Sequence, residues 1–211
     1  MNQTFWTDER IAGSLLVGSL IVLLLAVILL FASGAMSGFF AMLGGSLAQV
    51  APYAGTFRLL ILFFILGWFV QLLGTGLLAR LLVHKGGEQL AFLAFTLILV
   101  ATIFAVLYSA FRMSVELWAA QEAARTGSLP AVYEPLKAWT HVIFGVSERV
   151  YFLATAGFGW GILRTGLLAR WVGWMAIGWS LLWLLVGLSG GVPPATPLIM
   201  PAVIGLTLLR E

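Results

Sequence analysis

Charged side chains are scarce in this sequence: Asp, Glu, Lys and Arg together make up only 9% of its 211 residues. Soluble domains carry about a quarter of their residues as charged side chains. Hydrophobic residues make up 62% of the chain, so a soluble fold of this length would lack the polar side chains to cover its surface. The composition therefore predicts an integral membrane protein, with the lipid bilayer as its solvent.

Cysteine is absent, which excludes disulfides, thiol catalysis and thiolate metal sites. His84 and His141 are the only histidines. The topology predicted below places them on opposite sides of the membrane, which disfavours a bis-histidine haem or a di-histidine metal site. The motifs of zinc proteases, serine hydrolases and phosphate-binding loops are also missing. We therefore expect no catalytic residues, no metal and no cofactor, and these absences disfavour an enzyme.

The formal net charge of +3 is small and does not come from a block of basic residues. Such a charge indicates loops beside anionic lipid headgroups, and we expect no binding of nucleic acid.

Six apolar segments of helical length predict a six-transmembrane-helix bundle forming a single all-α membrane domain over residues 1–211. The first has 22 residues and would be about 33 Å long as a helix, against a hydrocarbon core of about 30 Å. The acidic residues Asp8 and Glu9 precede this span, and they favour a retained membrane anchor over a cleaved signal peptide. Ser14 and Gly18 form a small-residue face on it that suits helix contact. The predicted spans are residues 11–32, 58–80, 88–111, 141–164, 171–188 and 193–209.

The helical pattern of the third span continues past Phe111 to Arg125, and Gly127 and Pro130 predict its end. A helix over residues 88–125 would be about 57 Å long. We therefore expect this helix to extend beyond the membrane on the outer side.

The uncharged, glycine-rich segment 33–56 leaves two interpretations open. It folds back over the bundle at the membrane interface, where irregular backbone must be shielded by protein, or it is an apolar surface loop.

The distribution of Lys and Arg between the loops predicts that both termini face the cytoplasm. With this orientation the outer side receives Arg125 and Lys137, and three further arginines lie close to its membrane boundary, namely Arg58, Arg112 and Arg149. The cytoplasmic side receives the larger basic set, namely Arg10, Arg80, Lys85, Arg164, Arg170 and Arg210.

The hexamer TGLLAR occurs at residues 75–80 and again at residues 165–170. The two copies are offset by 90 residues. Such an offset is consistent with a parallel duplication, in which spans two and three correspond to spans four and five. Chance similarity between short membrane segments is the alternative interpretation.

One concentration of polar residues is expected near the outer face, from three different spans. Structural ion pairs are the first interpretation: Glu148 with Arg58 or Arg112, and Arg149 with Glu116. A ligand or ion site is the second, and proton chemistry is the third. The candidate residues are Arg58, Arg112, Glu116, His141, Glu148 and Arg149.

The depth of Glu148 and Arg149 depends on where the fourth span ends. If the hydrocarbon core ends at Arg164, Arg149 is immersed in it. If the hexamer marks equivalent boundaries, the core ends at Arg170, and Glu148 aligns with Arg58 near the outer edge. We favour the second interpretation, in which Glu148 and Arg58 form a bond between two helices.

Four short motifs lie along the chain: Phe57-Arg58, Arg112-x-x-x-Glu116, Gly161-x-x-Arg164-x-x-Leu167-x-x-Arg170-Trp171-x-Gly173-Trp174, and Pro193-Pro194 with Gly205. Together they resemble a bacterial membrane protein family catalogued as domain of unknown function 4386. The similarity covers most of the chain and implies a compact multi-pass protein of the bacterial inner membrane. It supplies no catalytic residues.

Two functional classes follow from the sequence. Few polar residues lie within the spans, which favours an accessory or assembly subunit that docks on a larger membrane complex. The alternative is a protein that binds or transports a small solute or lipid through the outer polar cluster. The expected partners are the bilayer and, for the first class, proteins of that complex.

Overall fold

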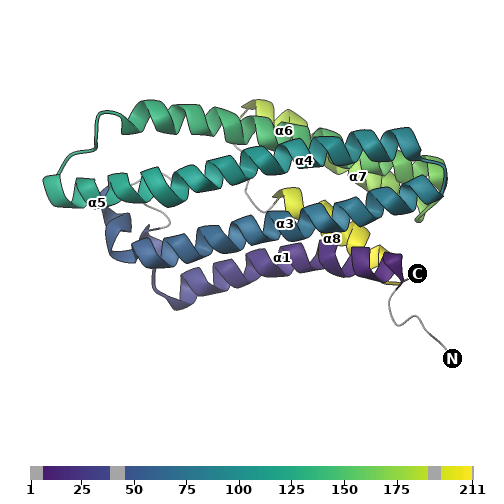
Figure 1. Ribbon diagram of the computed structural model, residues 1–211, viewed down its shortest axis with the longest axis horizontal. Helices are drawn as coiled ribbons and strands as arrows, with labels where there is room; N and C mark the ends of the chain where they lie inside the picture. The colour runs from purple at the N-terminus through teal and green to yellow at the C-terminus, as the bar shows by residue number, and fades with distance from the viewer. Residues whose placement is uncertain (1–6, 39–45, 190–195, 211) are drawn as a thin grey trace.

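The computed structural model describes residues 7–38, 46–189 and 196–210, and these residues are all-helical apart from short turns. Figure 1 shows the helices lying side by side in one elongated bundle. In chain order they are α1 (Asp8–Ala32), the 3₁₀-helix η1 (Leu47–Tyr53), α3 (Ala54–His84), α4 (Glu88–Phe111), the π-helical turn η2 (Arg112–Glu116), α5 (Leu117–Thr126), α6 (Tyr133–Thr165), α7 (Arg170–Ser189) and α8 (Thr196–Leu208).

Four helical segments are long and apolar enough to cross a membrane. This confirms the predicted all-helical class, with helices that are able to span a membrane. α6 is long enough, with 33 residues, but Glu148 and Arg149 lower its apolar character. α8 has 13 residues and would be about 20 Å long, shorter than a hydrocarbon core. The four segments are Asp8–Ala32, Leu47–His84, Glu88–Thr126 and Arg170–Gly187.

Several helices are longer than the spans predicted from the sequence. α6 begins at Tyr133, eight residues before the predicted start, because polar residues such as Glu134 and Lys137 are helical without being apolar. α4, η2 and α5 follow one another without a break, as predicted for an extended third helix. The helix stops before Gly127, whose φ of +77° is a left-handed cap that favours glycine. Residues 193–195 of the sixth predicted span lie outside the described part of the chain, and α8 covers the rest.

The bundle has two ends, and Figure 1 shows both termini at one of them. We call this the terminal end; it also contains the α3–α4 turn at Lys85 and the α6–α7 turn at Leu167. The opposite end is called the α5 end. There η1 packs against α5, and Leu47 and Val50 are buried with Leu117. The described part of segment 33–56 therefore folds back onto the bundle, and residues 39–45 lie outside the described chain.

Glycines set the closest approaches between helices. A Cβ added to Gly13 of α1 would lie 2.7 Å from the backbone oxygen of Gly205 in α8, and the reverse distance is also 2.7 Å. α6 and α7 meet in the same way through Gly159 and Gly173. Gly18, expected on the small-residue face of α1, has only an ordinary contact with α3, because its Cβ would lie 3.8 Å from Val70.

The two TGLLAR copies have different conformations, so the hexamer does not mark equivalent boundaries. Residues 75–80 lie inside α3, which continues to His84. Residues 165–170 contain the end of α6, a turn and the first residue of α7, and Gly166 has a φ of +65°. Arg80 and Arg170 are therefore not structural counterparts, and the predicted alignment of Glu148 with Arg58 at the same depth is wrong.

Candidate functional site

A pocket of about 300 Å³ lies between α1, α3, α4 and α6, toward the α5 end of the bundle. Its volume is at the lower limit of typical small-molecule sites, roughly 300–1,000 Å³. We call it the outer pocket. Its walls are formed largely by apolar side chains: Leu23, Val27, Leu30 and Phe31 from α1, Met36 beyond it, Leu60, Ile61 and Phe64 from α3, and Phe144 from α6.

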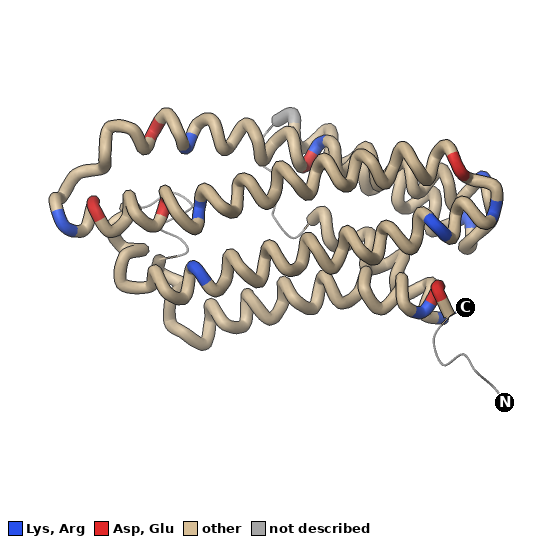
Figure 2. The backbone as a smooth tube through the Cα atoms, viewed as in Figure 1, with Lys and Arg blue, Asp and Glu red and all other residues tan. Residues whose placement is uncertain are grey.

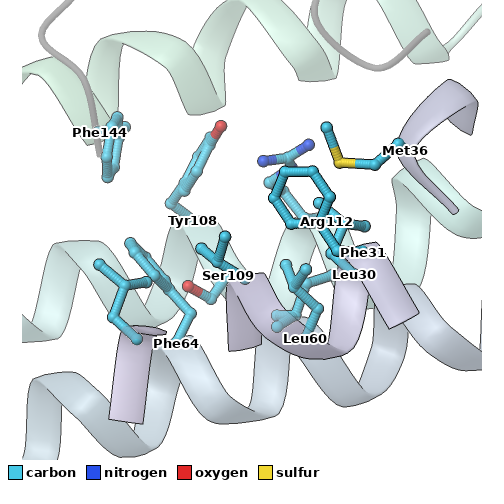
Figure 3. A pocket seen from close by; sticks show the side chains of 12 residues that line it. Leu30, Phe31, Met36, Leu60, Phe64, Tyr108, Ser109, Arg112 and Phe144 are labelled. Atoms are coloured by element: carbon cyan, nitrogen blue, oxygen red, sulfur yellow. The ribbon is translucent and has the colours of Figure 1, made fainter. Parts of the chain in front are cut away.

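Polar groups enter the outer pocket from one side only, where α4 passes into η2. Figure 3 shows Tyr108 and Arg112 extending into the space between Phe144 and Met36. Ser109 also lines the pocket, but its hydroxyl donates to the carbonyl oxygen of Ala105 at 2.8 Å. The polar groups that remain directed at the pocket are therefore the phenol and the guanidinium.

Arg112 is held in place by two contacts within its own helix. Its Nε donates to Oε2 of Glu116 at 2.6 Å, and the two side chains are 23% and 8% exposed. Its guanidinium carbon lies 5.7 Å from the centre of the Tyr108 ring, within the range of a cation–π contact. The residues between Arg112 and Glu116 form the π-helical turn, a local widening that occurs frequently at functional sites.

Tyr108 connects the polar side of the pocket to α6. Its ring stacks on Phe144 with a centroid distance of 4.4 Å and lies 6.3 Å from the His141 ring at a tilted angle. His141 itself is exposed. Three of the six candidate residues, Arg112, Glu116 and His141, therefore gather here around Tyr108.

Glu148 and Arg149 lie apart from this group. The Nη2 of Arg149 donates to the carbonyl oxygen of Gly187 in α7 at 3.1 Å. Glu148 is buried, with 6% of its surface exposed, and its Oε1 has no hydrogen-bond partner among the described residues. Among the described residues, the ion pair of Arg112 is with Glu116, and no ion pair joins Glu148 to Arg58 or Arg149 to Glu116. The expected pairing is therefore wrong, because Glu116 binds the arginine of its own helix.

Arg58 is exposed near the start of α3, and its depth differs from that of Glu148. A Cβ added to Gly76 of α3 would contact Phe95 of α4, so these two residues lie at the same level of the bundle. Because α3 and α4 are antiparallel, Arg58 then lies at about the level of Arg112. The Oγ of Ser147 donates to the carbonyl oxygen of Ala101 at 2.7 Å, which sets the adjacent Glu148 level with about Ala101 of α4. The two levels differ by about ten residues, or roughly 15 Å along the bundle. Figure 2 shows the same separation: charges gather at both ends, and one red and blue pair lies part-way along α6.

The apolar walls of the outer pocket could not be found from the sequence. Leu30, Leu60 and Phe144 come from three helices far apart in the chain, and each has the apolar character of any lipid-facing residue. The position of Tyr108 beside Arg112 could have been predicted from the sequence, because the two residues are four apart and therefore share one face of a helix.

The outer pocket combines apolar walls with polar groups on one side. The described residues contain no group of three or more His, Asp or Glu side chains that could hold a metal ion. What they offer is an apolar pocket with an arginine, a tyrosine and a paired carboxylate on one side. Such a site matches a molecule that is apolar over most of its length and polar at one end.

Comparison of the chain with protein-family models, with curated proteins and with solved structures finds no match in any of the three.

Proposed function

We propose that this chain is a six-span membrane protein, with both termini in the cytoplasm, that binds a lipid-like amphipathic molecule in the outer pocket. The observation that carries this proposal is the pocket of about 300 Å³ between α1 and α6 with its polar groups confined to one side. The resemblance to the bacterial family catalogued as domain of unknown function 4386 belongs to the same proposal. It adds the inner membrane of a bacterium as the location.

The arrangement of the helices supports the topology. α1 and α3 contact each other at the terminal end, where Arg80 and Asp8 approach to 3.7 Å. Helix ends on that side carry most of the basic residues, as expected for a cytoplasmic face. The α5 end then lies outside, and the outer pocket lies where α4 reaches the outer boundary of the bilayer.

The position of the polar groups supports a specific orientation of the ligand. The acyl or isoprenoid part lies against Leu30, Leu60 and Phe64, which is apolar surface already at membrane depth. The head lies beside Tyr108 and Arg112, which form the polar side of the pocket. Because Glu116 neutralises Arg112, a head with hydrogen-bond acceptors suits the site, whether it is neutral or anionic.

Filling the pocket tests the proposal. Leu60→Trp should occlude the space beside Leu30 and Phe64 and abolish the retention of one lipid by the purified protein. The measurement is native mass spectrometry from nanodiscs that contain phosphatidylglycerol and phosphatidylethanolamine, after loosely held lipid has been removed by collisional activation.

Leu59→Trp is the matched control, because Leu59 is the preceding residue of α3 and is 45% exposed on its lipid-facing surface. This variant should retain the lipid as the wild type does. If the wild type retains no lipid, or if both variants behave alike, the proposed ligand site is wrong.

Single cysteines test the topology, because the chain has none of its own. In intact cells a membrane-impermeant maleimide should label Ser128→Cys at the α5 end and leave Lys85→Cys unlabelled until the membrane is broken. Both positions are exposed, so accessibility within the fold does not limit either reaction. The opposite pattern would reverse the orientation.

A second function, an accessory subunit that docks on a larger membrane complex, is favoured by a different observation. Apolar side chains remain exposed on the helices that extend toward the α5 end, beyond the proposed membrane boundary, among them Trp118 at 47% and Trp139 at 60%. Lipid tails do not cover side chains at that position, whereas a protein partner would. Co-purification of a stoichiometric partner in mild detergent, lost on Trp139→Glu and kept on Leu60→Trp, would support this function.

A further inference from the structure

Several polar groups are buried in the bundle on the inner side of the outer pocket, without hydrogen-bond partners among the described residues. Buried polar groups in folded proteins nearly always have a partner in the protein or in ordered water, so each exception requires an explanation. The atoms are Nε1 of Trp68, both amide atoms of Gln71, Oγ1 of Thr102, Oε1 of Glu148 and the phenol of Tyr151.

These groups come from three helices and lie close together. The Ser147–Ala101 hydrogen bond brings α4 and α6 together at the level of Thr102 and Glu148. Tyr151 follows Glu148 by one turn of α6, and its ring meets that of Trp68 at a centroid distance of 5.4 Å. Gln71 follows Trp68 by one turn of α3. The unpartnered groups therefore form one connected region directed toward the bundle centre, which we call the buried polar track.

The track leads from the outer pocket to a small internal cavity. Phe64 and Phe144, which line the pocket, stand one turn away from Trp68 and Glu148 on the same helices. The cavity has a volume of about 10 Å³ and is lined in part by Thr75, Tyr151 and Thr155. The rest of its lining is apolar, including Leu16, Ile98 and Phe158. A cavity needs roughly 10–15 Å³ and polar partners to hold one water molecule. This one has about the volume of a single water, and the Tyr151 phenol is its unpartnered polar group.

The hydrogen-bonding chemistry of the unpartnered atoms indicates which ligand the buried polar track can hold. Trp68 only donates, an ionised Glu148 only accepts, and the hydroxyls of Thr102 and Tyr151 do both. A metal cation cannot be bound by the indole N–H, which is only a hydrogen-bond donor. A water molecule can bond to donors and to acceptors. A buried carboxylate without a cationic partner is costly in a membrane, and protonation removes that cost.

We propose that Glu148 binds and releases a proton through a short hydrated track formed by Trp68, Gln71, Thr102 and Tyr151. This inference does not depend on a ligand in the outer pocket. It concerns a different set of residues and would stand if the pocket held no lipid.

Few other charged or titratable groups face Glu148. On α6 they are Arg149, which is directed to the Gly187 carbonyl oxygen, and Tyr151. α4 contributes Tyr108, with Arg112 beyond it. At this level α3 presents Trp68 and Gln71, which do not titrate, and the only charged residue of α7 is Arg170 at the terminal end. A pH-dependent change at this site is therefore attributed to Glu148.

Carbodiimide labelling of the wild-type protein in nanodiscs tests the proton site. A hydrophobic carbodiimide reacts with a protonated carboxyl from within the membrane, so it should modify Glu148, and the adduct should be lost as the pH is raised. A water-soluble carbodiimide should instead modify Glu134, an exposed carboxyl on the same helix. Glu148→Gln should lose only the hydrophobic adduct. No adduct at Glu148 at any pH, or an adduct independent of pH, would overturn the proton site.

Radiolytic hydroxyl labelling tests the water. Tyr151 and the adjacent Phe152 are equally buried, at 1% exposure each, and hydroxyl radicals formed from a bound water attack both ring types. Oxidation of Tyr151 without oxidation of Phe152 supports the hydrated track. Equal labelling, or none at either residue, overturns it. Apart from the Glu148→Gln control, both readouts use the wild-type protein, so neither deciding result requires a substituted protein to fold.

Discussion

Replacing Gly13 with alanine is expected to destabilise the protein strongly by forcing α1 away from α8. The new Cβ would lie 2.7 Å from the backbone oxygen of Gly205 and 2.9 Å from the Leu209 side chain. Backbone cannot rotate away as a flexible side chain can, so the helices themselves must separate. Overpacking of a well-packed interior costs about 1–3 kcal/mol, and we expect the upper part of that range. Thermal unfolding in detergent, followed by near-ultraviolet circular dichroism, measures the loss.

Gly178→Ala is the control, because a Cβ at this exposed position of α7 would meet nothing within 4 Å. Alanine is also the better helix former by about 1 kcal/mol, so this variant should be as stable as the wild type or slightly more stable. Gly205→Ala should reproduce the Gly13→Ala result, since each glycine faces the backbone oxygen of the other. A Gly13→Ala protein as stable as Gly178→Ala would contradict the close packing of α8 on α1.

The second large effect concerns the Arg112–Glu116 pair. Arg112→Gln should leave Glu116, whose side chain is only 8% exposed, as a buried carboxylate without its 2.6 Å partner. Removing one member of a buried ion pair typically costs about 3–5 kcal/mol. The double variant Arg112→Leu with Glu116→Leu should recover much of that loss, because no charge then remains buried. Urea or thermal unfolding of the wild type, Arg112→Leu, Glu116→Leu and the double leucine variant completes a double-mutant cycle and gives the coupling between the two residues.

The exposed pair on α5 provides the comparison. Arg125 donates to Glu122 from Nε at 3.1 Å and from Nη2 at 2.5 Å, with its own side chain 72% exposed. Solvent screens such a pair, so Arg125→Gln should change stability little. If Arg112→Gln were equally mild, Glu116 would have to be solvated, and the polar side of the outer pocket would be open to water.

The outer pocket and the buried polar track are formed by the same helices. α4 contributes Tyr108 to the outer pocket and Thr102 to the track, and α6 contributes Phe144 and then Glu148 one turn further in. Ligand occupancy next to Glu148 would change its access to water. Carrying out the carbodiimide experiment on Leu60→Trp would show whether filling the pocket alters proton binding.

Local chemistry was sufficient for much of the fold. Apolar runs of helical length predicted helices able to cross a membrane, and Gly127 correctly marked the end of the extended third helix. Arg112 and Glu116 could be placed on one face from their spacing of four. These features depend on neighbouring residues and on the solvent, so the sequence contains them directly.

Contacts between distant segments were decided only by the tertiary structure. The TGLLAR copies differ because Gly166 adopts a positive φ at a helix end whereas Gly76 lies within a continuous helix. Glu148 was assigned to Arg58, but the register of α3, α4 and α6 separates them by roughly 15 Å. The sequence by itself determined which residues are helical and suited to lipid, because helix formation and transfer to the membrane are local. Which polar groups meet, and where the pocket lies, depended on helix register and on glycine contacts such as Gly13 with Gly205, which no local pattern encodes.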